Sequence, residues 1–183
     1  MIIGLTGRIA AGKSEVVNIL AEGYGFTKLS FGEEVRTEAY ARSIEITREN
    51  LQALGAKFTI EFGESYWAKR ISARINKKEN HVIDGFRYPG QVKFFKELYK
   101  DKFHFLRIDA RYETRLKRFL NRGRRDDLLT EESFREVDDA DWSGGDGGQN
   151  VSECFGMADI IISNEDSLDF LKKDITKFLI TKI

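Results

Sequence analysis

The sequence has one cysteine, no net charge and no apolar run long enough to span a bilayer. Because Cys154 has no second cysteine, the chain forms no internal disulfide and no cysteine-based zinc site, which excludes a metal-stapled lid. We interpret Cys154 as a small, partly buried hydrophobic residue. The lack of disulfides suits a reducing compartment, so we expect a cytoplasmic protein.

The charge balance excludes another set of functions. Thirty Lys and Arg residues offset 30 Asp and Glu residues, so nothing favours a general nucleic-acid or membrane-surface binder. The apolar start, residues 1–5, lacks a preceding basic segment and is too short for a signal peptide. We expect it to be a buried strand. We expect no nucleic-acid or membrane partner, and a monomer or homodimer.

The 183 residues fit one domain, residues 1–183, with 41% hydrophobic and 33% charged residues. Short apolar runs alternate with amphipathic segments, which predicts an α/β, three-layered fold around a five-stranded parallel sheet. The expected strands are residues 1–6, 28–31, 81–84, 103–109 and 158–163. The expected helices are residues 14–22, an interrupted helical region at 33–78 with Thr47 as an N-cap, 113–121 and 167–179, with a polar stretch between 121 and 150.

Ligands bind such sheets at the carboxyl ends of the strands. The loop at residues 7–14, Gly-Arg-Ile-Ala-Ala-Gly-Lys-Ser, follows the first strand and matches G-x-x-x-x-G-K-[ST] in full. Its backbone N–H groups and the following helix N-terminus would bind phosphates, with Lys13 on the β- and γ-phosphates and Ser14 on Mg²⁺. We predict ATP and Mg²⁺ as cofactors. Asp84, at the end of the third expected strand, is the second candidate metal ligand. The predicted nucleotide-binding residues here are Gly7, Ala10, Ala11, Gly12, Lys13, Ser14 and Glu15.

Four further segments carry a family resemblance. Residues 84–91 (DGFRYPGQ), 30–36 (SFGEEVR) and 124–127 (RRDD) resemble segments of adenylate kinases, and residues 158–164 (ADIIISN) are similar to the ending of dephospho-coenzyme A kinases. Together they resemble archaeal-type adenylate-kinase-like proteins. The glycine-rich, acidic insert at residues 138–148 departs from that pattern.

The resemblance implies a P-loop nucleotide kinase and several residue roles. Arg36 and Arg87 would hold the acceptor's phosphate, as their fork-shaped guanidinium groups suit. Gln91 would read a base edge or be a solvated helix residue. Residues 33–78 would bind the acceptor, and residues 118–150 would form a lid with a hinge at 143–148. Asn164 would also bind the nucleotide, and Asp84 would also bind the substrate. The lid arginines Arg122 and Arg125 would neutralise the transferring phosphoryl group, with Arg118 and Arg124 as neighbours.

The acceptor stays open at this point. A nucleoside or deoxynucleoside monophosphate needs no strong base, whereas dephospho-coenzyme A presents a hydroxyl and would want a carboxylate, for which Glu33 or Glu34 is the candidate. Aromatic residues within 33–78 either stack on a base or fill the core. A GTPase switch is disfavoured because residues 76–79 (NKKE) precede a strand and end in glutamate. A P-loop ATPase module that regulates or binds another macromolecule is the remaining alternative.

Overall fold

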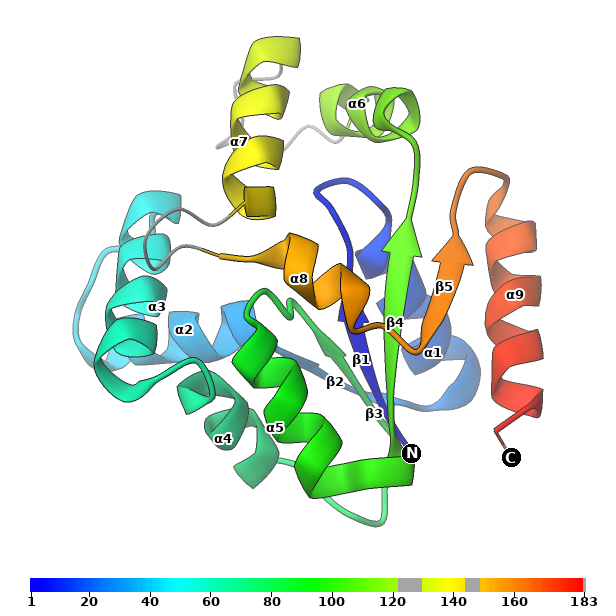
Figure 1. Cartoon of the computed structure of the whole chain (residues 1–183), viewed down its shortest axis with the longest axis horizontal. Helices are drawn as coiled ribbons and strands as arrows, with labels where there is room; N and C mark the ends of the chain where they lie inside the picture. Colours follow the sequence, from blue (N-terminus) through cyan, green and yellow to red (C-terminus); the bar gives the residue numbers. More distant parts are fainter. Residues whose placement is uncertain (122–129, 144–148, 183) are drawn as a thin grey trace.

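A parallel β-sheet forms the centre of the molecule (Figure 1). The computed structural model describes residues 1–121, 130–143 and 149–182. Within them the five strands lie in the order β2-β3-β1-β4-β5, and every pair is parallel. The strands are β1 (Ile2–Thr6), β2 (Thr27–Ser30), β3 (His81–Asp84), β4 (Phe103–Asp109) and β5 (Ile160–Ser163). The predicted fold class is confirmed, and all five expected strands are present with ends shifted by two residues or fewer.

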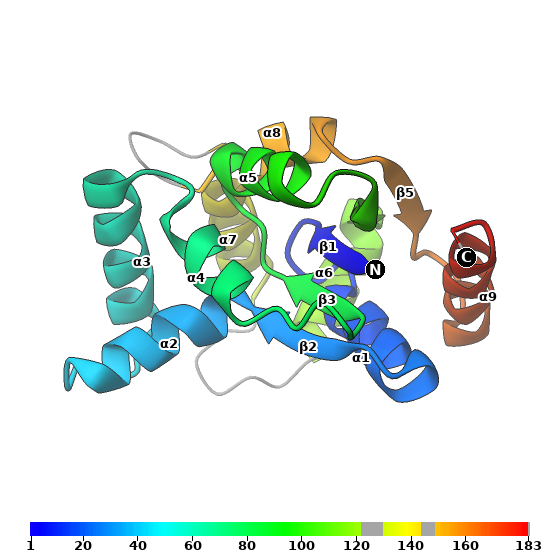
Figure 2. The same ribbon diagram turned by 90° about the horizontal axis from the view of Figure 1, so that it is seen from below.

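Two hydrophobic clusters cover the two faces of the sheet, so the fold has three layers (Figure 2). One cluster joins the sheet to α1 (Lys13–Tyr24) and α9 (Leu168–Ile180), through residues such as Val16, Leu20 and Ile175. The other joins it to α5 (Pro89–Tyr99) and α8 (Val151–Gly156) and is rich in aromatic rings, among them Phe95 and Phe105. Burial of both faces explains why the central strand β1 shows as a short, nearly continuous apolar run in the sequence, whereas the edge strand β2 is largely exposed.

The interrupted helical region after β2 folds as three helices at one side of the sheet (Figure 1). They are α2 (Phe31–Ala41), α3 (Arg48–Phe62) and α4 (Tyr66–Ala73). The predicted N-cap is confirmed, since the Thr47 hydroxyl accepts a hydrogen bond from the Asn50 N–H at 3.2 Å. Phe58 and Trp67 are buried among these helices, as core residues at helical spacing should be.

The stretch between residues 121 and 150 was expected to be polar, with no helix assigned to it, and part of it is helical. After α6 (Tyr112–Asn121) the chain forms helix α7 (Glu131–Ser143), which lies beyond the carboxyl end of the sheet (Figure 1). Helix α7 buries one aromatic ring, Phe134, and one carboxylate, Asp138. A helix anchored by a buried charge lacks the apolar stripe that reveals helices in a sequence.

The remaining helical turn is η1 (Lys100–Lys102), which leads into β4. No helix in the part of the chain that the structure describes is long and apolar enough to cross a membrane.

Candidate active site

The loop between β1 and α1 has the backbone geometry that its glycines predict. Gly12 has φ 98°, in the left-handed region, and a Cβ there would lie 2.0 Å from Asn164 Nδ2. A Cβ at Gly7 would lie 2.6 Å from the Ile108 carbonyl oxygen. Both positions therefore need glycine, one for its conformation and its contact and the other for its contact. The loop ends at the N-terminus of α1, where the free N–H groups favour an anion.

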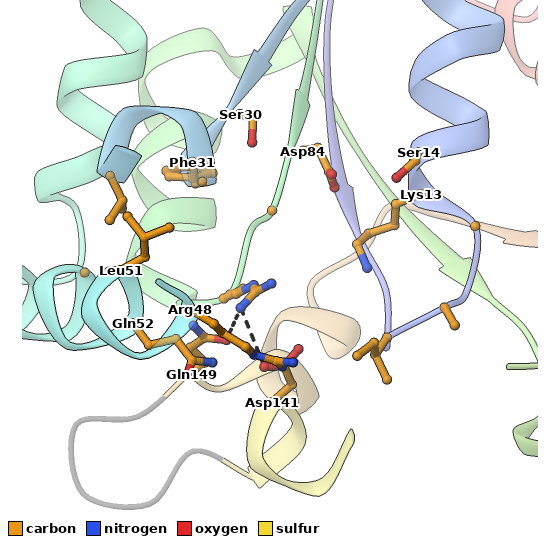
Figure 3. Close-up of a pocket in the computed structure, with 18 of the residues that line it drawn as sticks. Lys13, Ser14, Ser30, Phe31, Arg48, Leu51, Gln52, Asp84, Asp141 and Gln149 are labelled. Atoms are coloured by element: carbon orange, nitrogen blue, oxygen red, sulfur yellow. Dashed lines mark hydrogen bonds and ion pairs between the residues drawn. The ribbon is translucent and has the colours of Figure 1, made fainter. Parts of the chain in front are cut away.

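Lys13 lies inside this loop and points into the cavity beside it (Figure 3). Its ammonium donates hydrogen bonds to the carbonyl oxygens of Gly7, at 2.7 Å, and Arg8, at 3.2 Å. Burial lowers the pKa of Lys13 because it removes water from the ammonium, whereas the nearby Asp84 and Asp141 carboxylates raise it. The loop thus holds a partly desolvated cation that is hydrogen-bonded to carbonyl oxygens and lies near both carboxylates and the guanidinium groups of Arg87 and Arg115.

Asp84 ends β3, directly beside β1, where it pairs in register with Leu5. Its Oδ1 atom is buried and accepts no hydrogen bond from any residue that the structure describes. A buried carboxylate oxygen without a partner is costly unless a ligand satisfies it. Ser14 is exposed at the same cavity, and Figure 3 shows its hydroxyl and the Asp84 carboxylate on neighbouring walls. Two oxygen ligands beside a phosphate loop fit a magnesium ion that takes its other ligands from phosphate and water.

Asn164 follows β5 and is hydrogen-bonded to the backbone of the phosphate loop. Its side-chain N–H donates to the Ala11 carbonyl oxygen at 2.8 Å, and its backbone N–H donates to the Asp109 carbonyl oxygen at 2.8 Å. Arg118 of α6 donates to Asn164 Oδ1 and to the Ala11 carbonyl oxygen, both at 3.5 Å. Asn164 therefore positions the loop backbone, whether or not it also contacts a nucleotide. The other lid arginines, Arg122, Arg124 and Arg125, lie outside the described residues, as do residues 144–148 of the expected hinge at 143–148.

A cavity of about 820 Å³ runs from the phosphate loop to helices α2 and α3. It brings together most of the residues expected to act: Ala10, Gly12, Lys13, Ser14, Glu15, Arg36, Asp84, Arg87, Gln91 and Asn164 all line it. Gly7 and Ala11 belong to the loop itself but do not line the cavity. Parallel strands end at one edge of a sheet, which is why residues so far apart in sequence meet here.

On the acceptor side, Arg36 pairs with Glu33 on the same helix. Arg87 donates to Gln149 Oε1 and lies 3.6 Å from Asp141 Oδ1. Both arginines line the cavity and carry fork-shaped donors toward it.

Gln91 is only 2% exposed, so its interpretation as a solvated helix residue is wrong. Its Oε1 atom accepts hydrogen bonds from the backbone N–H groups of Arg87, at 3.0 Å, and Tyr88, at 3.2 Å. Gln91 therefore caps the start of α5 and holds the Arg87 backbone in place. Its NH₂ group is the part left to meet a ligand.

Several residues that line the cavity belong to no sequence motif. Apolar side chains from α2 and α3 and the loop between them form one wall: Phe31, Val35, Ile46 and Leu51. Arg48 and Gln52 stand beside Leu51 on α3, facing Lys13 and Ser14 across the cavity (Figure 3). Asp141 and Gln149, which flank a segment that the structure does not describe, complete the lining. These residues come from helices whose placement over the sheet the sequence does not specify.

Helix α7 contacts the phosphate loop through a shared carboxylate. Asp138 binds Arg8 with two contacts, at 2.6 and 3.0 Å, and Arg115 at 2.5 Å. Arg8 also lies over the ring of Trp142, 4.5 Å from its centroid. Arg115 in turn donates to the Ile9 carbonyl oxygen at 3.4 Å. The helix that covers the site is therefore joined to two residues of the loop that would hold phosphate.

Glu33 and Glu34, the carboxylates expected to serve a hydroxyl acceptor, do not line the cavity. Glu34 is buried and pairs with Arg70 and Arg74 of the α4 region. Glu33 is exposed and pairs with Arg36. The expectation that either acts as a base is therefore wrong, because α2 presents Phe31, Val35 and Arg36 to the cavity, whereas Glu34 faces α4.

Comparison with solved structures shows the same fold. The chain is similar to shikimate kinase from Acinetobacter baumannii in complex with shikimate, with a TM-score of 0.60 and 17% identity over 100% of this chain and 94% of that one. It is also similar to shikimate kinase from Aquifex aeolicus (TM-score 0.58, 17% identity, 99% and 97% covered) and to a gluconokinase from Sinorhizobium meliloti (TM-score 0.58, 13% identity, 98% and 91% covered). The chain therefore has the fold of small P-loop kinases.

Comparison with sequences shows the family. A family model described as an AAA domain matches residues 6–135, which include the phosphate loop and Asp84. The chain is 34% identical to UPF0200 protein TV0279 of Thermoplasma volcanium, with 96% of this chain and 94% of that one covered. It is 33% identical to UPF0200 protein PYRAB09750 of Pyrococcus abyssi, with 100% and 97% covered. The loop, the fold and the sequence matches agree, and the chain belongs to the AAA domain family and to the UPF0200 family.

Proposed function

We propose that the protein transfers the terminal phosphoryl group of ATP, with magnesium, to a small nucleotide-like acceptor. The observation that carries the proposal is one cavity lined by most of the phosphate loop, by a buried Asp84 carboxylate oxygen that has no partner among the described residues, and by Arg87 on the far side. Loop, carboxylate and arginine are the parts that phosphoryl transfer needs, because the reaction depends on positioning and charge stabilisation.

Each residue has a role in this proposal. The loop N–H groups and Lys13 bind the β- and γ-phosphates, and Ser14 and Asp84 hold the metal. When bound, magnesium neutralises charge on the phosphate oxygens. Asn164 and Arg118 keep the loop in shape. Arg122 and Arg125 are proposed to reach the transferring group from the lid, residues 118–150.

The acceptor is proposed to bind against α2 and α3. The wall that includes Val35 and Leu51 suits a flat ring, while Arg36 and Arg87 suit an anionic group. A nucleoside or deoxynucleoside monophosphate fits this description, and dephospho-coenzyme A is the alternative. The attacking atom is a phosphate oxygen in the first case and a hydroxyl oxygen in the second.

The test is ADP release from ATP and magnesium, coupled to an optical assay, across AMP, CMP, UMP, GMP, their deoxy forms and dephospho-coenzyme A. Stimulation by one acceptor supports the proposal and names the substrate. The Lys13→Ala variant should lose turnover and keep its thermal unfolding profile, because the hydrogen bonds that Lys13 makes within the described part of the chain go to loop carbonyl oxygens. Turnover at the wild-type rate in Lys13→Ala would refute the assignment. Slow ADP release that no acceptor changes would favour the ATPase module.

A further inference from the structure

Asp141 is a carboxylate in the cavity to which the loop motif and the family resemblance assign no role. It lies on α7, its side chain is 14% exposed, and Oδ1 is 3.6 Å from Arg87 Nη1. Figure 3 shows it beside Gln149, at the edge of the space between Lys13 and the α3 side chains. The cavity contains other carboxylates, so the question is which of them could contact an acceptor.

Among the carboxylates at the cavity, Asp141 is the one best placed to contact an acceptor. The carboxylates that line the described part of the cavity are Glu15, Asp84, Asp141 and Asp166. Glu15 and Asp166 are exposed to solvent. Asp84 lies beside Ser14 and is the proposed metal ligand. Asp141 is the half-buried carboxylate that remains, and it is on the acceptor side, next to Arg87.

The helix holds Asp141 firmly. One turn earlier, Asp138 is bound by Arg8 and Arg115. The next residue, Trp142, packs against Arg8 and edge-to-face on Phe155, with ring centroids 5.0 Å apart. Contacts on both sides therefore fix the carboxylate relative to the phosphate loop, which is the requirement for a group that acts on a bound substrate.

The position also lies between the two groups that would bind the reactants. Lys13 would hold the transferring phosphoryl group and Arg87 the acceptor, so the attacking atom must lie between them. Asp141 lies 3.6 Å from Arg87, and Figure 3 shows it on the wall of the same cavity into which Lys13 points. A carboxylate here repels an ionised phosphate oxygen but accepts a hydrogen bond from a hydroxyl.

We propose that Asp141 is a catalytic carboxylate that accepts the proton of an acceptor hydroxyl, so that the substrate class is an alcohol on a ring or sugar and not an ionised phosphate. The inference rests on the proposed function and narrows its acceptor. The acceptor O–H bond breaks and its proton passes to an Asp141 oxygen. The freed electron pair forms a new bond from the acceptor oxygen to the γ-phosphorus, and the bond from that phosphorus to the bridging oxygen breaks, which releases ADP.

The variants are Asp141→Asn, which removes the charge and the proton acceptor, and Glu136→Gln as a control. Glu136 lies on the same helix, is exposed and does not line the cavity. Turnover is measured with dephospho-coenzyme A, shikimate and gluconate as hydroxyl acceptors and with AMP as a phosphate acceptor. Binding of AMP and of adenosine is measured by calorimetry, with the donor site filled by a non-hydrolysable ATP analogue.

We expect a hydroxyl acceptor to be phosphorylated by the wild type, and Asp141→Asn to lower its kcat by roughly 10²- to 10⁴-fold with the KM for ATP unchanged. We expect the same variant to bind AMP about tenfold more tightly, since one like charge is removed, and adenosine no more tightly. Glu136→Gln should match the wild type in both assays.

Two results would overturn the inference. The first is a hydroxyl acceptor whose kcat is the same in Asp141→Asn and wild type. The second is no gain in AMP affinity in Asp141→Asn, including no detectable binding by either protein. If Asp141→Asn binds AMP more tightly but keeps the wild-type kcat with a hydroxyl acceptor, Asp141 only competes with the acceptor's phosphate for Arg87 and is not a catalytic base. If no acceptor of either class stimulates the wild type, the proposed function fails, and the binding result alone then decides whether Asp141 repels an anion.

Discussion

Replacing Asp138 by alanine removes the carboxylate that Arg8 and Arg115 share. Asp138 and Arg115 are 2% and 3% exposed, so the variant leaves the Arg115 guanidinium buried with carbonyl oxygens as its remaining partners. Removing one partner of a buried ion pair costs roughly 3–5 kcal/mol. Arg8, at 24% exposed, can turn toward water and adds little.

The expected loss in the free energy of unfolding is therefore about 3–5 kcal/mol, which corresponds to a fall in Tm of roughly 6–20 °C for a chain of this size. Detachment of α7 alone would cap the loss, because the rest of the chain would then remain folded. The chain has two tryptophans that separate these cases. Trp142 lies on α7 against Arg8, and Trp67 is buried near α2 and α3.

The assay is urea unfolding followed by tryptophan fluorescence, with a Trp142→Phe background to isolate Trp67. A control, Asp139→Ala, removes a carboxylate on the same helix that is 70% exposed and 3.8 Å from Arg8, and should cost less than about 1 kcal/mol. The double variant Arg115→Met, Asp138→Leu should recover most of the loss, because it removes both buried charges. If the fluorescence of both tryptophans shows that Asp138→Ala loses less than about 1 kcal/mol in the free energy of unfolding, the reasoning is refuted, because no buried ion pair would then exist.

Two further predictions concern single side chains. Arg87→Ala should raise the KM for the acceptor or lower kcat while ATP affinity stays the same, measured by steady-state kinetics; a loss confined to ATP affinity would show that Arg87 is a donor-site residue. Cys154 is fully buried, and burial raises the pKa of its thiol to about 12. It should therefore resist a thiol reagent at pH 8 in the native protein and react in urea, and rapid labelling of the native protein would contradict the packing of α8.

The sequence predicts much of this structure because its central strand is buried on both faces. β1 (Ile2–Thr6) appears as a short apolar run, as does β5 (Ile160–Ser163), and the chirality and parallel order of such sheets leave few arrangements. The phosphate loop follows from two glycines and a lysine at fixed spacing. Both signals are local, so they can be read without knowing what packs against them.

What the sequence does not reveal depends on contacts between distant segments. Helix α7 is fixed by Asp138 between two arginines, and nothing in its own residues marks that carboxylate as buried. Gln91 lines the cavity, as its motif predicts, but its role as a cap for Arg87 and Tyr88 depends on the orientation of its side chain. Asp141 reaches the cavity only because α7 lies across it.

The proposed reaction transfers a phosphoryl group from ATP to a small acceptor. Mass spectrometry of a reaction with ATP, magnesium and the acceptor panel tests it most directly, since it shows where that group ends. With the wild type we expect a product that is heavier than the acceptor by one phosphoryl group, and with Lys13→Ala we expect no such product. Inorganic phosphate as the sole product, at the same rate with and without acceptors, would contradict it.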